Sequence, residues 1–257
     1  MSAAAIYPDL EGKVAAITGG SAGIGAETAR LLAANGVRVA VMARRPEPVA
    51  AIVAELRAEG ADAVGVTGNA ASREDTERFR ATVEAELGPT DLVMPFAGGF
   101  RSYTPLEDIT EDEWRRVIDD NLTSTFLTVK AFLGGMIERG RGAFVTMASN
   151  SARLVDVPLT ASYAASKGGV IVFTRHAAKE LGRHNIRVNC IAPATTMSER
   201  LEAVMPEEIK ERVTALSPLG RIGAPADSAH ACVFLASDVS SWMTGVTLDV
   251  AGGRVML

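Results

Sequence analysis

The stretch VAAITGGSAGIGAETARLL, residues 14–32, decides the fold. A short apolar run leads into a turn containing Gly19, Gly23 and Gly25, and a sequence with helical periodicity follows. Glycines in such a turn let the backbone approach a pyrophosphate, whose charge is stabilised at the amino end of the helix. Because the turn joins a strand to a helix, it predicts a dinucleotide-binding loop, with Ser21 and Ile24 inside it, rather than an ordinary βα turn.

The same alternation of apolar runs and helical segments continues along the chain. The β-prone runs are residues 14–18, 37–43, 63–67, 91–97, 142–148, 186–192 and 245–250. Strand–helix alternation indicates a parallel sheet with helices on both faces, and nearly continuous apolar runs indicate strands buried on both sides. We therefore predict an α/β fold and a single domain over residues 1–257.

Two helix starts and one irregular segment complete this organisation. Ser72 with Asp75, and Thr110 with Glu113, have the spacing of a capping box, and the second pair opens a long helical segment that contains Asn121. Residues 193–223 hold short helical pieces and no strand pattern. Long insertions in compact domains are often lids, so we predict a substrate lid within 194–217; the alternative is a fixed helical cover over the sheet edge.

Composition excludes several classes of protein. Apolar residues make up 47% of the 257 residues, which excludes intrinsic disorder. The net charge of −5 argues against a nucleic-acid partner. No apolar stretch approaches the ~20 residues that span a bilayer, and the first residues do not resemble a signal peptide. Two cysteines and three histidines show no metal-ligand spacing. We expect a cytoplasmic protein with no metal site and no membrane contact.

The end of the second strand indicates the type of dinucleotide. Enzymes that bind NAD usually place an acidic side chain there to bond the ribose 2′-hydroxyl. Here Ala43 and Arg44 occupy that region, and no carboxylate follows until Glu47. Arginine suits a 2′-phosphate by charge and by its forked donors, which favours NADP(H) over NAD(H). The alternative is that Arg44 and Arg45 are solvated loop charges.

Further polar residues form a candidate catalytic set. Tyr163 and Lys167 are four residues apart, so on a helix their side chains share a face. Ser149 ends the strand pattern that precedes them. Asn121 stands inside a predicted helix, where asparagine has poor propensity and is more often a satisfied polar group than a catalyst.

Together these residues resemble one family, the short-chain dehydrogenases/reductases. The motifs that carry the resemblance are TGGSAGIG at 18–25, NLTSTF from Asn121, MAS ending at Ser149, YAASK at 163–167, IRVNCIAPA at 186–194 and the segment 218–245. The resemblance covers about residues 10–253. It implies a Rossmann-type doubly wound sheet of about seven parallel strands, and usually a homotetramer.

The resemblance assigns catalysis to Asn121, Ser149, Tyr163 and Lys167. It implies that Tyr163 exchanges the proton with substrate, that Ser149 binds the carbonyl oxygen, and that Asn121 holds a water for Lys167. We expect the positive charges of Lys167 and of an oxidised nicotinamide to lower the pKa of the Tyr163 phenol. Ser151 is the alternative serine, because it lies 12 residues before Tyr163 and Ser149 lies 14 before it.

The resemblance also implies a set of contacts with the dinucleotide. They come from Gly19, Ser21, Gly23, Ile24, Gly25, Arg44, Asn69, Ala97, Gly98, Tyr163, Lys167, Pro193, Thr196 and Ser198. Four residues at three sites depart from the family pattern. Pro95-Phe96 replaces two asparagines, so we expect packing of Phe96 to brace the strand end. Asn69 replaces an aspartate but keeps an acceptor, and Ala194 replaces a glycine.

The resemblance therefore implies an NADP(H)-dependent oxidoreductase. It would reduce a ketone of a small molecule or acyl thioester, or oxidise the matching alcohol, and 3-oxoacyl-thioester reductases are the most frequent such sequences. The alternative is a non-catalytic NADP(H)-binding regulatory or scaffold protein. Arg101 and Arg153 could bind an anionic substrate, although exposed loop arginines are the simpler interpretation.

Overall fold

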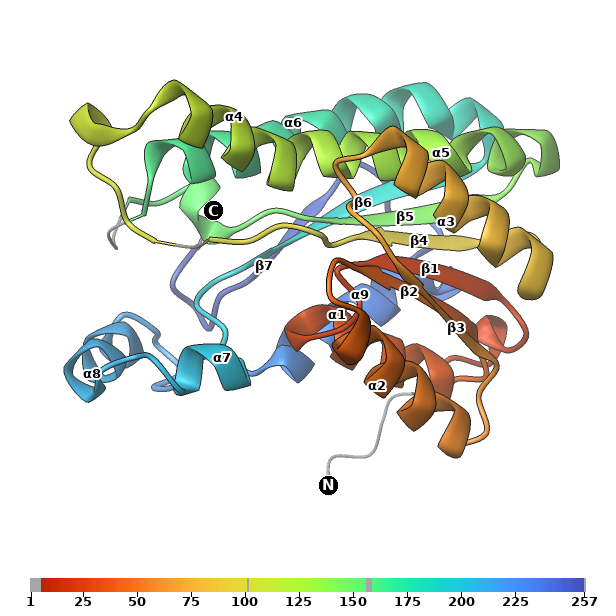
Figure 1. The fold of residues 1–257 in the computed structure, drawn as a ribbon, viewed down its shortest axis with the longest axis horizontal. Helices are drawn as coiled ribbons and strands as arrows, with labels where there is room; N and C mark the ends of the chain where they lie inside the picture. The colour runs from red at the N-terminus through yellow and green to blue at the C-terminus, as the bar shows by residue number, and fades with distance from the viewer. Residues whose placement is uncertain (1–5, 101, 156–158, 257) are drawn as a thin grey trace.

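The computed structural model describes residues 6–100, 102–155 and 159–256. In this part of the chain, seven strands form one parallel sheet in the order β3-β2-β1-β4-β5-β6-β7 (Figure 1). The strands are β1 (Val14–Thr18), β2 (Arg38–Ala43), β3 (Ala63–Thr67), β4 (Leu92–Pro95), β5 (Gly142–Met147), β6 (Ile186–Pro193) and β7 (Thr247–Val250). The predicted doubly wound α/β fold is confirmed.

Helices cover both faces of the sheet. One face carries α1 (Gly23–Ala34), α2 (Pro46–Ala58) and α9 (Pro225–Ala236), and the other carries α3 (Arg73–Glu86), α5 (Ser124–Arg139) and α6 (Ala161–Leu181). Successive residues of β1 enter different cores: Ala15 and Ile17 pack with α1 and α9, whereas Val14 and Ala16 pack with α3 and α5. Burial on both faces explains why the strand runs are almost continuously apolar.

The predicted helix starts are present, but the second helical segment is interrupted. The hydroxyls of Ser72 and Thr110 accept hydrogen bonds from the third amide that follows each, at 3.3 and 3.1 Å. α4 (Glu111–Ile118) then ends in a π-helical turn over Asp119–Thr123, after which α5 begins. In this turn the hydroxyls of Ser124 and Thr125 donate to the carbonyls of the residues four positions earlier, at 2.8 and 2.9 Å. Such side-chain competition for backbone carbonyls distorts helices.

The segment after β6 contains the short helical pieces that the sequence predicts. These are α7 (Glu199–Glu202) and α8 (Glu207–Ala215), which Figure 1 shows beyond the end of the sheet where α1 begins. A single bridge between Thr196 and Gly223 closes the base of this segment. The segment therefore stands next to the glycine turn while making little regular contact with the sheet.

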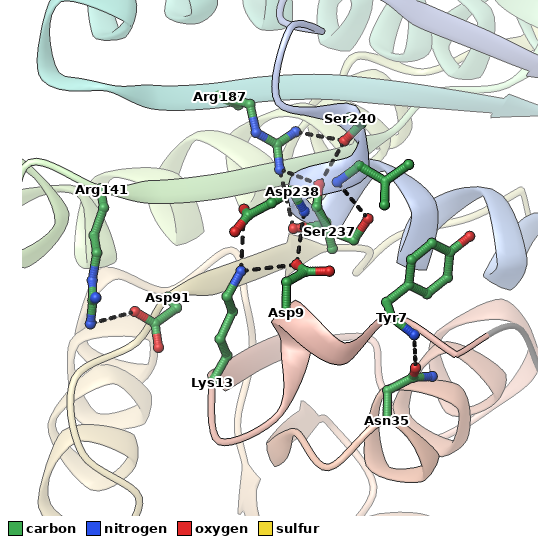
Figure 2. A network of polar contacts seen from close by, with 12 residues as sticks. Tyr7, Asp9, Lys13, Asn35, Asp91, Arg141, Arg187, Ser237, Asp238 and Ser240 are labelled. Atoms are coloured by element: carbon green, nitrogen blue, oxygen red, sulfur yellow. Dashed lines mark hydrogen bonds and ion pairs between the residues drawn. The ribbon is translucent and has the colours of Figure 1, made fainter.

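A polar network at the amino ends of the strands joins the two ends of the chain (Figure 2). Lys13 pairs with both Asp9 and Asp238 at 3.3 Å, and Asp9 also accepts a hydrogen bond from the amide of Asp238 at 2.8 Å. Arg187, at the start of β6, donates to the carbonyls at the end of α9 and to Ser240. This edge of the sheet is filled by structural contacts, and the carboxyl edge is left for a site.

Candidate active site

A cleft of about 740 Å³ lies at the carboxyl ends of the strands, where the strand order reverses between β1 and β4. Open parallel sheets bind ligands at such a switch point. Most of the residues predicted to bind the dinucleotide line this cleft, namely Gly19, Ser21, Gly23, Ile24, Gly25, Arg44, Asn69, Ala97, Gly98, Thr196 and Ser198. Pro193, Tyr163 and Lys167 lie outside the lining of this cleft.

The glycine turn has the geometry of a cradle. A side chain at Gly25 would place its Cβ 2.2 Å from the carbonyl oxygen of Gly19, so only glycine fits this contact. Gly23 has a positive φ of 54°, and a Cβ there would meet only the Ser198 side chain, at 4.0 Å. The backbone at Gly23 therefore faces open space at the amino end of α1. This arrangement fits the pyrophosphate of a dinucleotide, as the sequence predicts.

The departure at the end of β4 is accommodated by packing and by β1. Phe96 is buried in the core on the α1 face, and its amide donates to the carbonyl of Thr18 at 3.0 Å. The Thr18 hydroxyl accepts from the amide of Ala97 at 3.4 Å. These contacts brace the strand end without the two asparagines of the family pattern.

Asn121 lies in the π-helical turn with its side chain buried and fully engaged. Its Oδ1 accepts from the amide of Gly99 at 2.8 Å, and its Nδ2 donates to the carbonyl of Val117 at 3.0 Å. A side chain at Gly98 would place its Cβ 2.5 Å from this Oδ1. Asn121 thus fixes the loop after β4. Because its side chain is engaged, a water molecule that links Asn121 to Lys167 would have to bind the main-chain carbonyl of Asn121.

Ser149, Tyr163 and Lys167 meet at the carboxyl end of β5. Thr160 caps α6 by accepting from the amide of Tyr163 at 3.3 Å, which sets where the helix starts. One turn later, the Nζ of Lys167 lies 5.9 Å from the centre of the Tyr163 ring and donates to the carbonyl of Met147 at 2.8 Å. The Ser149 side chain lies beside the Tyr163 phenol, where a hydrogen bond between the two hydroxyls lowers the phenol pKa. The sequence-predicted helix face is therefore present, with the serine at its side.

The structure favours Ser149 over Ser151 as the partner of the phenol. The Ser149 hydroxyl accepts from the amide of Ser151 at 3.2 Å as well as contacting Tyr163. The Ser151 hydroxyl is buried and has no hydrogen-bond partner among the described residues. Both serines lie at a suitable distance along the chain from Tyr163, but only Ser149 interacts with the phenol.

Burial shifts the pKa values of both Tyr163 and Lys167. Burial raises the pKa of the Tyr163 phenol, and the hydrogen bond from Ser149 opposes this shift only in part. Desolvation of the phenolate is the largest effect in the protein by itself, and the lowering of this pKa by Lys167 together with an oxidised nicotinamide stays a prediction. Burial lowers the pKa of Lys167 to about 8, against a smaller opposing charge interaction with Cys190.

Of the two arginines considered for substrate binding, the structure describes only Arg153. Arg153 is largely buried and pairs with Asp249 on β7, with its Nε 3.1 Å from the carboxylate. It is therefore neither an exposed loop arginine nor an uncompensated cation. Arg101 lies outside the described residues, as does the segment 156–158 of the loop that leads to α6.

Phe100, within the segment 99–103 that we expect to line the substrate pocket, packs edge-on against the Tyr163 ring with 5.7 Å between the ring centres. One residue at the site escaped the sequence analysis: Asp120, which lines the cleft beside Arg44. Asn69 also lines the cleft, but its Oδ1 already accepts from the amide of Ala71 at 3.1 Å. Only the interrupted helix could have pointed to Asp120, because π-helical turns are frequent at functional sites.

Comparison with known proteins identifies the family. A family model described as enoyl-(acyl carrier protein) reductase matches residues 19–254. The chain belongs to the short-chain dehydrogenase/reductase family. Members of this family are oxidoreductases that typically use a nicotinamide cofactor. The family resemblance predicted from the motifs is thereby confirmed.

Curated relatives of this short-chain dehydrogenase/reductase include dehydrogenases and reductases. It is 34% identical over 247 residues to a 2,5-dichloro-2,5-cyclohexadiene-1,4-diol dehydrogenase of Sphingobium indicum, covering 95% of this chain and 98% of the relative. It is 36% identical over 245 residues to the 3-oxoacyl-(acyl-carrier-protein) reductase FabG of Staphylococcus aureus, again covering 95% and 98%. Dehydrogenases and reductases are thus both among its relatives.

Solved structures of the family superpose closely on this chain. The structure of gox2181 matches with a TM-score of 0.92 at 32% identity, covering 96% of this chain and 98% of the other. A 3-oxoacyl-(acyl-carrier-protein) reductase from Brucella melitensis with bound NAD matches with a TM-score of 0.90 at 32% identity, covering 98% and 94%. The described residues of this short-chain dehydrogenase/reductase include no helix that could cross a membrane and no cluster of side chains that could hold a metal ion.

Proposed function

We propose that this protein is an NADP(H)-dependent oxidoreductase that reduces a ketone of a small molecule or acyl thioester, or oxidises the matching alcohol. The observation that carries the proposal is the meeting of Ser149, Tyr163 and Lys167 next to the glycine-lined cleft. The relatives support the same class of chemistry, because they include a diol dehydrogenase and 3-oxoacyl reductases.

The side chains divide the chemistry in a simple way. A bound nicotinamide supplies or accepts the hydride. Tyr163 gives its phenolic proton to the carbonyl oxygen in reduction, and Ser149 donates a hydrogen bond to that oxygen. Because burial raises the pKa of Tyr163, the protein itself keeps the phenol protonated, which is the form that reduction requires. Lys167, mostly charged at neutral pH, stabilises the phenolate that remains after proton transfer.

A substrate panel tests the proposal. NADPH consumption is followed by the loss of its near-ultraviolet absorbance, with 3-oxoacyl thioesters, small ketones and cyclic diketones as substrates. Turnover of at least one carbonyl substrate is expected. NADPH binding without turnover across the panel would instead support the non-catalytic NADP(H)-binding alternative.

Arg44 is expected to set the preference for NADP(H). It lines the cleft after β2, and its guanidinium is largely exposed and able to reach a 2′-phosphate. Losing a charge-assisted hydrogen bond costs roughly 1.5–3 kcal/mol, so Arg44→Ala should weaken NADPH binding by about 10- to 100-fold and NADH binding far less. Dissociation constants for both cofactors check this, with Arg73→Ala, an exposed arginine outside the cleft lining, as the matched control. Equal affinities of the wild type for NADPH and NADH would contradict the preference.

The segment within 194–217 is expected to act as a substrate lid. Thr196 and Ser198 line the cleft, while α8 buries Val213 but leaves Ile209 exposed. Sparse packing of this kind marks regions that open locally. Amide hydrogen exchange in this segment should slow when NADPH and substrate bind, because closure orders the backbone. Strong protection already present in the ligand-free protein would identify a fixed cover.

We also propose assembly into a homotetramer. Exposed apolar side chains support it: Phe126 on α5 lies edge-on to Phe173 on α6, and Trp242 lies after α9. Exposed aromatic groups of this size are typical of interfaces. Light scattering should give about four times the chain mass of 26.9 kDa, and a monomer at micromolar concentration would contradict the assembly.

A further inference from the structure

A carboxylate stands opposite the arginine proposed to read the cofactor phosphate. The Nη1 of Arg44 lies 3.5 Å from the Oδ1 of Asp120, and both residues line the cleft. The two are 76 positions apart and come from different elements, Arg44 from the end of β2 and Asp120 from the π-helical turn. The end of β2 itself lacks an acidic side chain, so Asp120 brings one to that corner from elsewhere in the chain.

Of this pair, Asp120 is the fixed member. Its carbonyl accepts from the hydroxyl of Ser124 at 2.8 Å, and the next residue, Asn121, is held by the backbone of Gly99. The Asp120 side chain is 19% exposed, whereas that of Arg44 is 58% exposed. The arginine can therefore move towards a ligand, while the carboxylate stays where the turn places it.

The pair affects the two cofactors differently. A 2′-phosphate that binds Arg44 must compete with the Asp120 carboxylate for the guanidinium, whereas the 2′-hydroxyl of NAD(H) needs no contact with that cation. We propose that Asp120 adjusts cofactor specificity by holding Arg44, and so limits the preference for NADP(H) over NAD(H) that Arg44 provides. This inference rests on the proposed use of a nicotinamide dinucleotide.

The test compares cofactor affinities in charge-neutral variants. Dissociation constants for NADPH and NADH are measured by fluorescence titration in wild type and Asp120→Asn. The ratio of the NADH to the NADPH constant should rise roughly three- to tenfold, the scale of a partly exposed ion pair competing with a phosphate. In an Arg44→Ala background the same change should shift the ratio by about twofold or less, because the arginine that couples the two groups is gone.

Asp119→Asn is the matched control. It removes the same charge one residue away, from an exposed side chain that pairs with Thr123 and lies outside the cleft lining. Its cofactor ratio should match that of wild type. Asp120→Ala, with a melting curve for each variant, provides a second substitution in case the asparagine disturbs the turn.

The outcomes separate this inference from the proposed function. If wild type binds neither NADPH nor NADH, the proposed cofactor use fails and the role of Asp120 fails with it. If both cofactors bind but Asp120→Asn and Asp120→Ala leave the ratio unchanged, only the role of Asp120 is overturned. An equal shift in Asp119→Asn, or a full-sized shift without Arg44, overturns it as well.

Discussion

Tyr163→Phe should lower turnover of the best carbonyl substrate by at least about 10²- to 10⁴-fold, the usual contribution of general acid–base catalysis. The change removes the hydroxyl that contacts Ser149 and keeps the ring that packs on Phe100. The cap of α6 uses the backbone amide of Tyr163, so the helix start is unaffected. NADPH affinity and the melting temperature should therefore change little.

The assay is steady-state turnover together with NADPH titration. Tyr7→Phe is the matched control, because Tyr7 lies at the opposite edge of the sheet, in the polar network at the amino ends of the strands (Figure 2). It should keep wild-type turnover. If Tyr163→Phe also turned over normally, the proton donor would be elsewhere and the non-catalytic alternative would regain support.

Lys167→Met should lose activity and gain stability at neutral pH. Turnover and NADPH affinity should both fall, because the resemblance places this ammonium on the ribose hydroxyls and beside the phenolate. Stability should change in the opposite direction. Lys167 is only 3% exposed, and burial lowers its pKa from 10.5 to about 8. Methionine has a similar length and carries no charge that must be desolvated.

The pH dependence of this gain has a definite sign. Between pH 8 and pH 10.5 the unfolded chain binds more protons at Lys167 than the folded chain, so wild-type stability rises with pH across this window. The penalty is fully present below pH 8, where the buried lysine is charged. After allowing for the lost bond to Met147, Lys167→Met should be about 2 kcal/mol more stable at pH 7.

Urea unfolding of both proteins at pH 7 and pH 10.5 measures the effect. The stability advantage of the variant should be gone at the higher pH, because the wild-type lysine is then neutral in the folded state and only the cost of the lost bond to Met147 remains. A variant that is less stable than wild type by the same amount at both pH values would show that the bond to Met147 outweighs the desolvation of the ammonium.

The sequence predicted the parts of the site that depend on local pattern. The glycine turn, the sheet and the shared face of Tyr163 and Lys167 follow from spacing within one strand or helix. The break in the helix at Asn121 could not be predicted in this way. It arises from the hydroxyls of Ser124 and Thr125, which compete for backbone carbonyls only once the turn has formed. The Arg44–Asp120 pair depends on two distant elements meeting, which no local spacing reveals.

The sign of the Tyr163 pKa shift was also beyond local reasoning. A neighbouring ammonium suggests a lowered pKa, and the helical spacing placed Lys167 correctly. The degree of burial decides the direction, and burial depends on residues such as Phe100 that come from another part of the chain. Similarly, Ser149 and Ser151 have almost equal distances along the chain from Tyr163, and only the path of the loop separates them.

The polar network that joins the chain ends has a consequence for biosynthesis. Asp9 and Asp238 are 229 positions apart, so Asp9 leaves the ribosome long before its partner has been translated. Lys13 and Arg187 also have partners in this late segment, namely Asp238 and the carbonyls at the end of α9. β1 can pair with its neighbouring strands in the nascent chain. The polar contacts at its amino end form only when translation is almost complete. Newly made chains that stop short of α9 therefore keep this end of the strand open to water and to chaperones.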